Sequence, residues 1–181
     1  LRLLGGVIRE DGQIGNTGVT VPSDVLVMSW AAQRGIARIH VGERTYAGRE
    51  RGLHVVLIST EEGAPLDHGV FDLWAEPREA ERLVSYLRNV PEGMAAAFAV
   101  YDEASVFLTP EATAALEGFG LRRTAWVNNR LALFGLAYSF AALGVQGAAP
   151  GTGQQVWSPR DFAGAPGHPV VCGTVHAGDA Q

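Results

Sequence analysis

The sequence predicts an α+β domain, and three observations support this fold class. Residues 53–59 (LHVVLIS) are rich in β-branched side chains and almost continuously apolar, as in a strand that is covered on both faces. Residues 94–101 (MAAAFAVY) form a second apolar run of strand length. Between the two runs lies an apolar stripe at the i, i+3, i+4, i+7 spacing of a helix, formed by Ala80, Leu83, Val84 and Leu87.

Shorter strands are predicted on either side of the first apolar run. Residues 1–24 have weak periodicity and a glycine-rich centre, so we expect an extended arm or short strands there. Residues 25–30 and 35–41 predict a hairpin that turns at 33–35, because apolar and polar side chains alternate in its second half. Two further strands are predicted at 45–47 and 69–74.

Both predicted helices have recognisable ends. Pro77 stands where the first helix begins, and Pro91 and Gly93 follow its end. Thr109 supplies an N-cap for the second helix, with Pro110 at the first helical position. The buried face of the second helix is formed by Ala112, Ala115, Leu116 and Phe119, and Gly118 and Gly120 stop it. The last predicted strands are 124–128 and 138–145.

A change of composition divides the chain into three segments. From Ala148 onward Gly, Pro, Gln and Ala dominate, which predicts a mostly extended tail whose ordering depends on a partner surface. The predicted organisation is an extended arm at 1–24, a domain at 25–147 and a Gly/Pro-rich tail at 148–181.

Charge and composition exclude several classes of function. The net charge is −5, whereas a protein that binds nucleic acid presents a basic face to the phosphates. The uncharged run at 131–145 is short for a membrane span, so we expect no membrane insertion by this chain. The single cysteine, Cys172, cannot form a disulfide within the chain.

Two motifs in the tail carry weak chemical signals. Residues 150–153 (PGTG) resemble part of a phosphate-binding loop, but Gln154 and Gln155 stand where its Lys and Ser/Thr would be, which favours a flexible loop. His168, Cys172 and His176 are spaced by four, too far apart in an extended chain to share one metal ion. We therefore expect no metal site and no cofactor.

Other polar residues occupy the ends of the predicted strands. Asp102 and Glu103 follow the second apolar run, where a carboxylate can act as an acid or base but more often caps a turn or pairs with an arginine. Arg49 and Arg51 precede the first apolar run, and they either donate hydrogen bonds to a ligand or remain hydrated. His54, inside that run, is expected to be a core histidine whose ring is hydrogen-bonded. No nucleophile motif is present, so we expect no catalytic residues.

Motifs in the middle of the chain resemble the interleukin-like EMT inducer domain. They appear in the order of that family and are formed by residues 51–57 (RGLHVVL), 70–74 (VFDLW), 91–93 (PEG), 102–105 (DEAS) with Leu108 and Thr109, Leu116 with 118–120 (GFG), and 144–147 (GVQG). The resemblance implies two packed, mostly antiparallel or mixed β-sheets with two flanking helices, here with extended arms at both termini. It implies no catalytic activity.

The resemblance also implies a candidate sugar site. In the branch that forms the stem of protein O-mannose N-acetylglucosaminyltransferase, the domain recognises a β-linked N-acetylglucosamine end, and the matching contacts here are Arg51 and Asp102. Tyr101 and Tyr138 are candidate rings for the apolar face of the sugar. A further family arginine is replaced by Ala137, and its acidic neighbour by Tyr138. Arg122, Arg123 or Arg130 are candidates to substitute for that arginine in space.

Two hypotheses follow. The first is a non-catalytic, lectin-like carbohydrate-binding module of a larger or secreted protein. The second is a structural or protein-interaction module of an assembly, such as a cell-envelope or virus-like particle component, with contacts through both terminal arms. Both place the protein outside the cell, in the cell envelope or at a particle surface, with a glycan or a protein as the partner and no nucleic acid.

Overall fold

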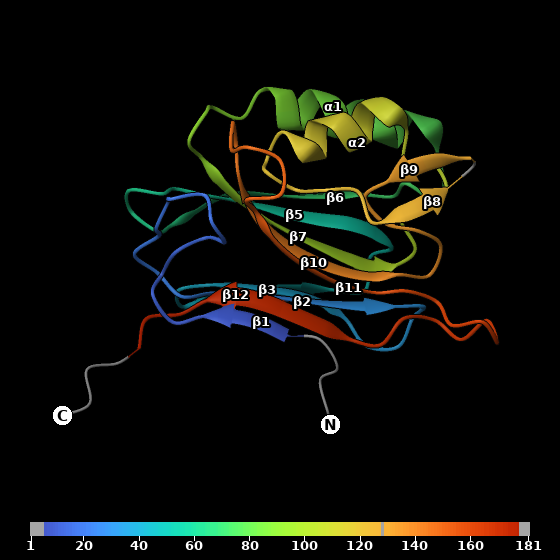
Figure 1. Cartoon of the computed structure of the whole chain (residues 1–181), viewed down its shortest axis with the longest axis horizontal. Coiled ribbons are helices and arrows are strands. Elements are labelled where there is room, and N and C mark those ends of the chain that lie inside the picture. Colours follow the sequence, from blue (N-terminus) through green and yellow to red (C-terminus); the bar gives the residue numbers. More distant parts are fainter. Residues whose placement is uncertain (1–5, 128, 178–181) are drawn as a thin grey trace.

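A computed structural model describes residues 6–127 and 129–177, and it confirms the α+β class with two packed sheets and two helices. Ten strands form one hydrogen-bonded network that is folded into two layers, and both helices cover the outer face of one layer (Figure 1). The chain therefore builds three layers, in the order helices, first sheet, second sheet. Leu1 and the other residues of 1–5, the predicted strand end at Asn128, and the tail at 178–181 lie outside the described residues.

The sheet beneath the helices contains the two apolar runs that the sequence indicated. Its strand order is β6 (Pro65–Phe71), β5 (Gly52–Ile58), β7 (Ala95–Asp102), β10 (Ser139–Val145) and β11 (Gln154–Ser158). All neighbours in this sheet are antiparallel. A separate hairpin, β8 (Ala125–Val127) and β9 (Arg130–Ala132), lies beside it.

The second sheet brings both ends of the described chain together. Its strand order is β1 (Gly6–Arg9), β12 (Val170–Thr174), β2 (Val25–Ala31), β3 (Ala37–Val41) and β4 (Arg44–Gly48). The end of β2 pairs in parallel with the end of β7 and joins the two sheets. The buried Ser29 strengthens this junction, because its hydroxyl donates to Val100 O at 2.5 Å and accepts from Phe140 N at 2.8 Å.

Alternation along β7 separates two apolar cores. Phe98 and Val100 face the helices α1 (Pro77–Arg88) and α2 (Pro110–Glu117), whereas Ala97 and Ala99 face the second sheet. The small alanine side chains let the second sheet approach closely. In α1 the predicted stripe is buried, and each of its Leu and Val side chains contributes about 1.5–3 kcal/mol by leaving water. Thr109 caps α2 as predicted, accepting the Ala112 N–H at 3.1 Å.

The boundaries predicted for one strand were wrong. Residues 69–74 were expected to form it, but β6 spans Pro65–Phe71. The Asp72 carboxylate accepts the N–H groups of Trp74 and Ala75 at 3.3 and 3.2 Å, which turns the chain out of the sheet. A register shift at Leu57/Ile58 accompanies the earlier start of β6.

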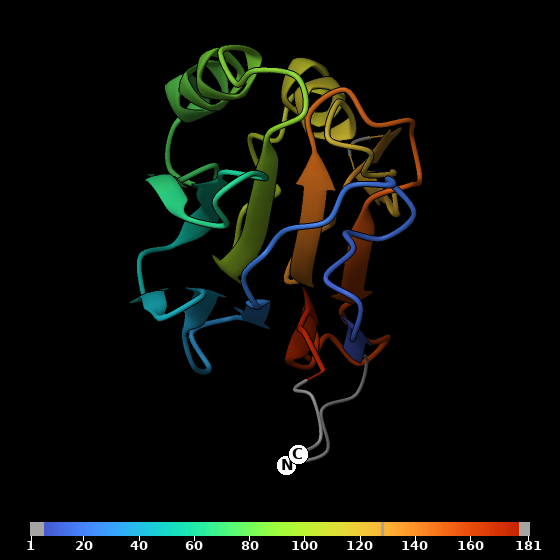
Figure 2. The same cartoon turned by 90° about the vertical axis from the view of Figure 1, so that its left-hand side faces the viewer.

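The terminal segments are integral parts of the sheets. The tail contributes β11 and β12, and its partner surface is the chain's own body, since β12 lies between β1 and β2. The segment that resembles a phosphate loop is the turn before β11, and there Thr152 O accepts a hydrogen bond from Asn16 N. Figure 2 shows β1 beside β12 from a second direction.

His54 is a core histidine, as predicted. It is 4 % exposed, and its Nε2 donates a hydrogen bond to Glu50 O at 2.7 Å. Burial of the ring holds the pKa of His54 below its usual value, since desolvation outweighs the favourable contact with the Glu50 carbonyl.

We expect the stability of the protein to fall as the pH drops from 7.5 to 5.5. The unfolded state binds a proton at His54 more readily than the folded state does, so protonation as the pH falls through ~6.5 favours unfolding. Urea unfolding at several pH values measures this slope. His54→Gln should reduce the slope, and the remainder should come from His40 and His68, whose pKa values are also lowered by burial. His168→Gln, at an exposed residue, serves as the matched control and should leave the slope unchanged. An unchanged slope in His54→Gln would refute the assignment.

Candidate ligand-binding site

The candidate residues Arg51 and Asp102 lie together at one end of the two sheets. Arg51 immediately precedes β5, and Asp102 is the last residue of β7. Gly52 of β5 pairs with Tyr101 of the antiparallel strand β7, so Arg51 and Asp102 occupy the positions just beyond this pair, at the same end of the sheet. Asp102 is close enough to contribute to the raised pKa of Arg51, after the larger effect of Asp72. The structure therefore brings these two predicted residues to one place.

The backbone at this end adopts unusual conformations. Four residues other than glycine have φ between 52° and 61°: Ala32, Gln33, Asp102 and Ala137. Among the described residues only one other non-glycine residue, Asn129, has positive φ. Each such residue costs roughly 1 kcal/mol, and strain of this kind concentrates at functional sites. The end of the sheets where β2 and β7 stop is therefore the most strained part of the described backbone.

Arg51 is held by an acid and an aromatic ring. Its Nε donates to Asp72 Oδ1 at 3.0 Å and its Nη2 to Asp72 Oδ2 at 2.9 Å, and its guanidinium lies 4.1 Å from the centre of the Trp74 ring. This pairing raises the pKa of Arg51. For Asp72, burial raises the pKa, but the hydrogen bonds and charge of Arg51 and the N–H groups of Trp74 and Ala75 together outweigh burial, and the net pKa lies below the usual value.

A glycine fixes the position of Arg51. Gly52 has φ of 124°, and a Cβ at this position would lie 2.1 Å from Phe71 O. The close approach of the two strands at this point excludes any side chain. Gly52 therefore sets Arg51 against the Asp72 carboxylate that follows β6.

Asp102 is partly open to solvent. Its Oδ2 accepts a hydrogen bond from Gln33 Nε2 at 3.3 Å, and its backbone carbonyl accepts one from Ala32 N at 3.1 Å. These contacts tie the end of β7 to the turn between β2 and β3, and the second carboxylate oxygen of Asp102 forms no hydrogen bond with a described residue.

Glu103 has a structural role, which confirms for this residue the turn-capping interpretation. Only 7 % exposed, it accepts N–H groups from Ala104 and Ser105 on Oε1 at 2.8 and 2.6 Å, and from Ala137 on Oε2 at 2.7 Å. The carboxylate thus joins the turn after β7 to the loop that leads into β10. Ala137, at the position where the resemblance implies an arginine, contributes its backbone N–H to this contact.

The two candidate tyrosines are not brought together. Tyr101 is 4 % exposed and lies in the core between the sheets, whereas Tyr138 packs, half-buried, against the core beneath the helices. Tyr101 therefore offers no ring face to solvent. The accessible ring at this end is Trp74, 47 % exposed, which the sequence did not indicate as a site residue.

The three candidate arginines are engaged elsewhere. Arg123 pairs with Glu117 at 2.9 Å, Arg130 Nη2 donates to Leu108 O at 2.7 Å, and Arg122 lies over the Trp157 ring. Within the described part of the chain, none of them forms a hydrogen bond with Asp102.

The evenly spaced residues of the tail also lie apart from one another. Cys172 is fully buried in β12, and burial raises the pKa of its thiol. His176 Nδ1 lies 3.1 Å from Asp24 Oδ1, and His168 is an exposed residue before β12.

The fold and the site define a class: a β-rich, two-sheet domain that carries a polar and aromatic cluster on the loops at one end. The chain belongs to the interleukin-like EMT inducer family, whose family model matches residues 51–147. The match includes Arg51, Asp72, Trp74 and Asp102. A comparison with curated proteins found no match.

Two general properties accompany the family assignment. The family is not known for catalysis, and proteins that contain this domain are generally secreted or extracellular. Among the described residues, no helix has the length and apolar character needed to cross a bilayer; α1, with 12 residues, and α2, with 8, are both shorter than a bilayer requires.

Proposed function

We propose that the chain is a non-catalytic carbohydrate-binding module whose ligand ends in a β-linked sugar of the N-acetylglucosamine type. The observation that carries the proposal is a cluster of side chains. Arg51 is paired with Asp72 and stacked on the exposed Trp74, and it lies beside Asp102, which is partly exposed to solvent. A location outside the cell, in the cell envelope or at a particle surface, is part of this proposal.

Each group in the cluster suits one part of a pyranose. The free carboxylate oxygen of Asp102 can accept hydrogen bonds from sugar hydroxyls, and Arg51 Nη1, which makes no hydrogen bond to a described residue, can donate to a hydroxyl or acetamide oxygen. The indole of Trp74 offers an apolar face to the C–H side of the ring. The pairing with Asp72 holds the guanidinium in place, which reduces the entropy lost on binding.

We expect β-linked N-acetylglucosaminides to bind the protein and Asp102→Asn to weaken binding about tenfold, since a hydrogen bond to a charged group contributes ~1.5–3 kcal/mol. Asparagine tolerates positive φ, so this variant keeps the backbone of Asp102 while it removes the charge. Trp74→Ala should weaken binding by a similar factor. Isothermal titration with an N-acetylglucosamine glycoside measures both effects.

The chain offers a matched control for the tryptophan. Trp126, on the separate β8–β9 hairpin, is 73 % exposed, and Trp126→Ala should leave sugar affinity unchanged. Equal effects of the two tryptophan variants, or no binding by the native chain to a panel of glycans, would contradict the proposal.

A second candidate function is a protein-interaction module of an assembly in the cell envelope or a virus-like particle. The observation that favours it is the edge strand β1, which pairs only with β12 among the described strands and exposes Val7 and Ile8 by 46 % and 48 %. An open edge with apolar side chains can accept another strand. Light scattering should then show self-association that Ile8→Lys abolishes, and a strictly monomeric native protein would exclude self-association through β1.

A further inference from the structure

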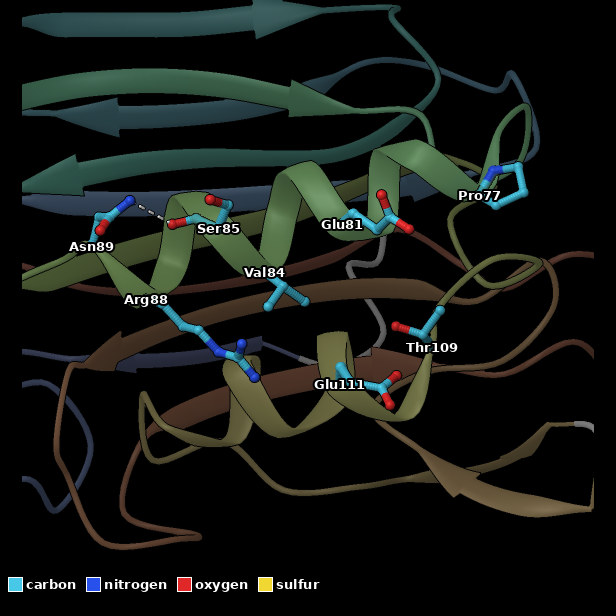
Figure 3. Close-up of a pocket in the computed structure, with 8 residues that line it drawn as sticks. All are labelled: Pro77, Glu81, Val84, Ser85, Arg88, Asn89, Thr109 and Glu111. Carbon is cyan, nitrogen blue, oxygen red and sulfur yellow. Dashed lines mark hydrogen bonds between the residues drawn. The ribbon is translucent and has the colours of Figure 1, made fainter.

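A groove of about 680 Å³ lies between α1 and α2, on the helix-covered side of the molecule. Its α1 wall carries Glu81, Val84 and Arg88, and its α2 wall begins with Thr109 and Glu111 (Figure 3). Both helices start at the same end of the groove, as Figure 3 shows. The groove is separate from the cluster around Arg51, because none of the residues that line it belongs to that cluster.

The charges in the groove are sorted along its length. Glu81 and Arg88 are seven residues apart, which places them on one face of α1 and about 10 Å apart along the helix axis. Glu111 lies in the first turn of α2, on the same side as Glu81, whereas Arg88 reaches across toward the other end of α2 (Figure 3). Two carboxylates therefore lie toward one end and a guanidinium toward the other, with the apolar Val84 between them.

The charged groups of Glu81, Arg88 and Glu111 do not pair with other charged groups of the described residues. These three side chains also form no hydrogen bond within the described residues. The ion pair between Glu79 and Arg82 of α1 does not line the groove, and Arg82 bonds instead to Val70 O of β6. Val84, by contrast, is 8 % exposed and forms the floor. The groove thus combines a fixed apolar floor with charged side chains that are available to a partner.

We propose that this groove binds an extended segment of a partner protein that carries a basic, an apolar and an acidic side chain at alternate positions. Alternate side chains of an extended chain point the same way, and positions i and i+4 are about 13 Å apart. The side chains of Glu81 and Arg88 are about 10 Å apart along the helix, and the long, flexible side chains on both partners can bridge the difference of about 3 Å. The basic residue pairs with Glu81 and Glu111, the apolar residue covers Val84, and the acidic residue pairs with Arg88.

The open form of the groove favours a polypeptide over a small molecule. Glu81, Ser85, Arg88, Asn89 and Glu111 are all exposed, so a small ligand would remain largely in water. Small-molecule sites bury most of their ligand. An extended peptide instead contacts the groove along its whole length and aligns three groups at once.

The test uses the whole chain and the peptide Gly-Lys-Ser-Leu-Ser-Asp-Gly with blocked ends, added at up to millimolar concentration to isotopically labelled protein. We expect amide chemical shifts to change in α1 and α2 and not around Arg51. The double variant Glu81→Gln with Glu111→Gln, and separately Arg88→Gln, should each weaken the peptide roughly fivefold, because exposed ion pairs contribute up to ~1 kcal/mol each. Glu43→Gln, in the turn between β3 and β4, is the control and should have no effect.

A reversal of preference distinguishes recognition from a structural effect. With Glu81→Lys and Glu111→Lys in place, the groove should prefer a peptide with Asp at both charged positions over the original peptide. Absence of shifts in the helices, equal binding of a peptide with Gln at both charged positions, or no change of preference in the lysine variant would each overturn the proposal.

Discussion

A chain that lacks residues 166–181 should not fold. The deletion removes β12, whose five residues are all buried and which pairs with β2 on one side and β1 on the other. Loss of Val170, Val171 and Cys172 alone removes roughly 5 kcal/mol of apolar burial, and the exposed edge of β2 adds unpaired backbone groups. The sum is comparable with the total stability of a domain, ~5–15 kcal/mol. Far-ultraviolet circular dichroism and thermal denaturation measure the outcome.

The control for this deletion lies in the loop before β12. Phe162 is fully exposed, so Phe162→Ser should leave the unfolding midpoint unchanged and show that the strand, not the loop, carries the stability. A truncated chain with a cooperative transition near the native midpoint would show that β1 and β2 can close the sheet without β12.

The second large effect concerns Glu103. We expect Glu103→Ala to lower the free energy of unfolding by about 3 kcal/mol, because three N–H groups that now bond to one buried carboxylate lose their acceptor. The same change should release the loop that contains Ala137. Urea denaturation measures the first effect, and hydrogen exchange at the Ala137 amide measures the second.

The conservative variant gives the contrast. Glu103→Gln keeps the shape but replaces one acceptor oxygen with an NH2 group that faces an N–H, so it should lose nearly as much stability as alanine. If the free energy of unfolding of Glu103→Ala differs from that of the native protein by less than ~1 kcal/mol, the capping role of Glu103 is contradicted. Glu50→Ala, at an exposed residue whose side chain bonds to no described residue, should change stability little.

The sequence predicted the fold best where one segment decides its own structure. The apolar runs that became β5 and β7, the stripe of α1 and the Thr109 cap of α2 were all placed correctly, because burial on both faces, helical spacing and capping are local signals. The strands β11 and β12 were not recognised as strands. Each has only five residues and a proline beside it, β11 contains two glutamines, and β12 contains a glycine. In addition, β12 is held by β2, which precedes it by about 140 residues.

The candidate site was predicted in the same uneven way. Arg51 and Asp102 came from the resemblance to a family, and the register between β5 and β7 does bring them together. Asp72 and Trp74 were missed because their position opposite Arg51 depends on where β6 ends and on the register shift near Leu57. Both the end of β6 and the register shift arise from the way β5 and β6 pair, which the local sequence does not indicate. Tyr101 was expected to contact the sugar, but its ring is buried. Its side of β7 is covered by the second sheet, and the position of that sheet could not be predicted from the local sequence.

The parallel pairing of β1 with β12 has a mechanical consequence. A force that pulls the two ends of the chain apart acts on β1 toward its N-terminal end and on β12 toward its C-terminal end. Because the two strands are parallel, these forces are opposed along one axis, and they load the hydrogen bonds between the strands together in shear instead of opening them one at a time. The Gln154 side chain adds a cross-link at this point, because its Nε2 donates to Val7 O at 2.6 Å and to Gly173 O at 2.7 Å. A force applied between β1 and β12 would therefore have to break several hydrogen bonds at once.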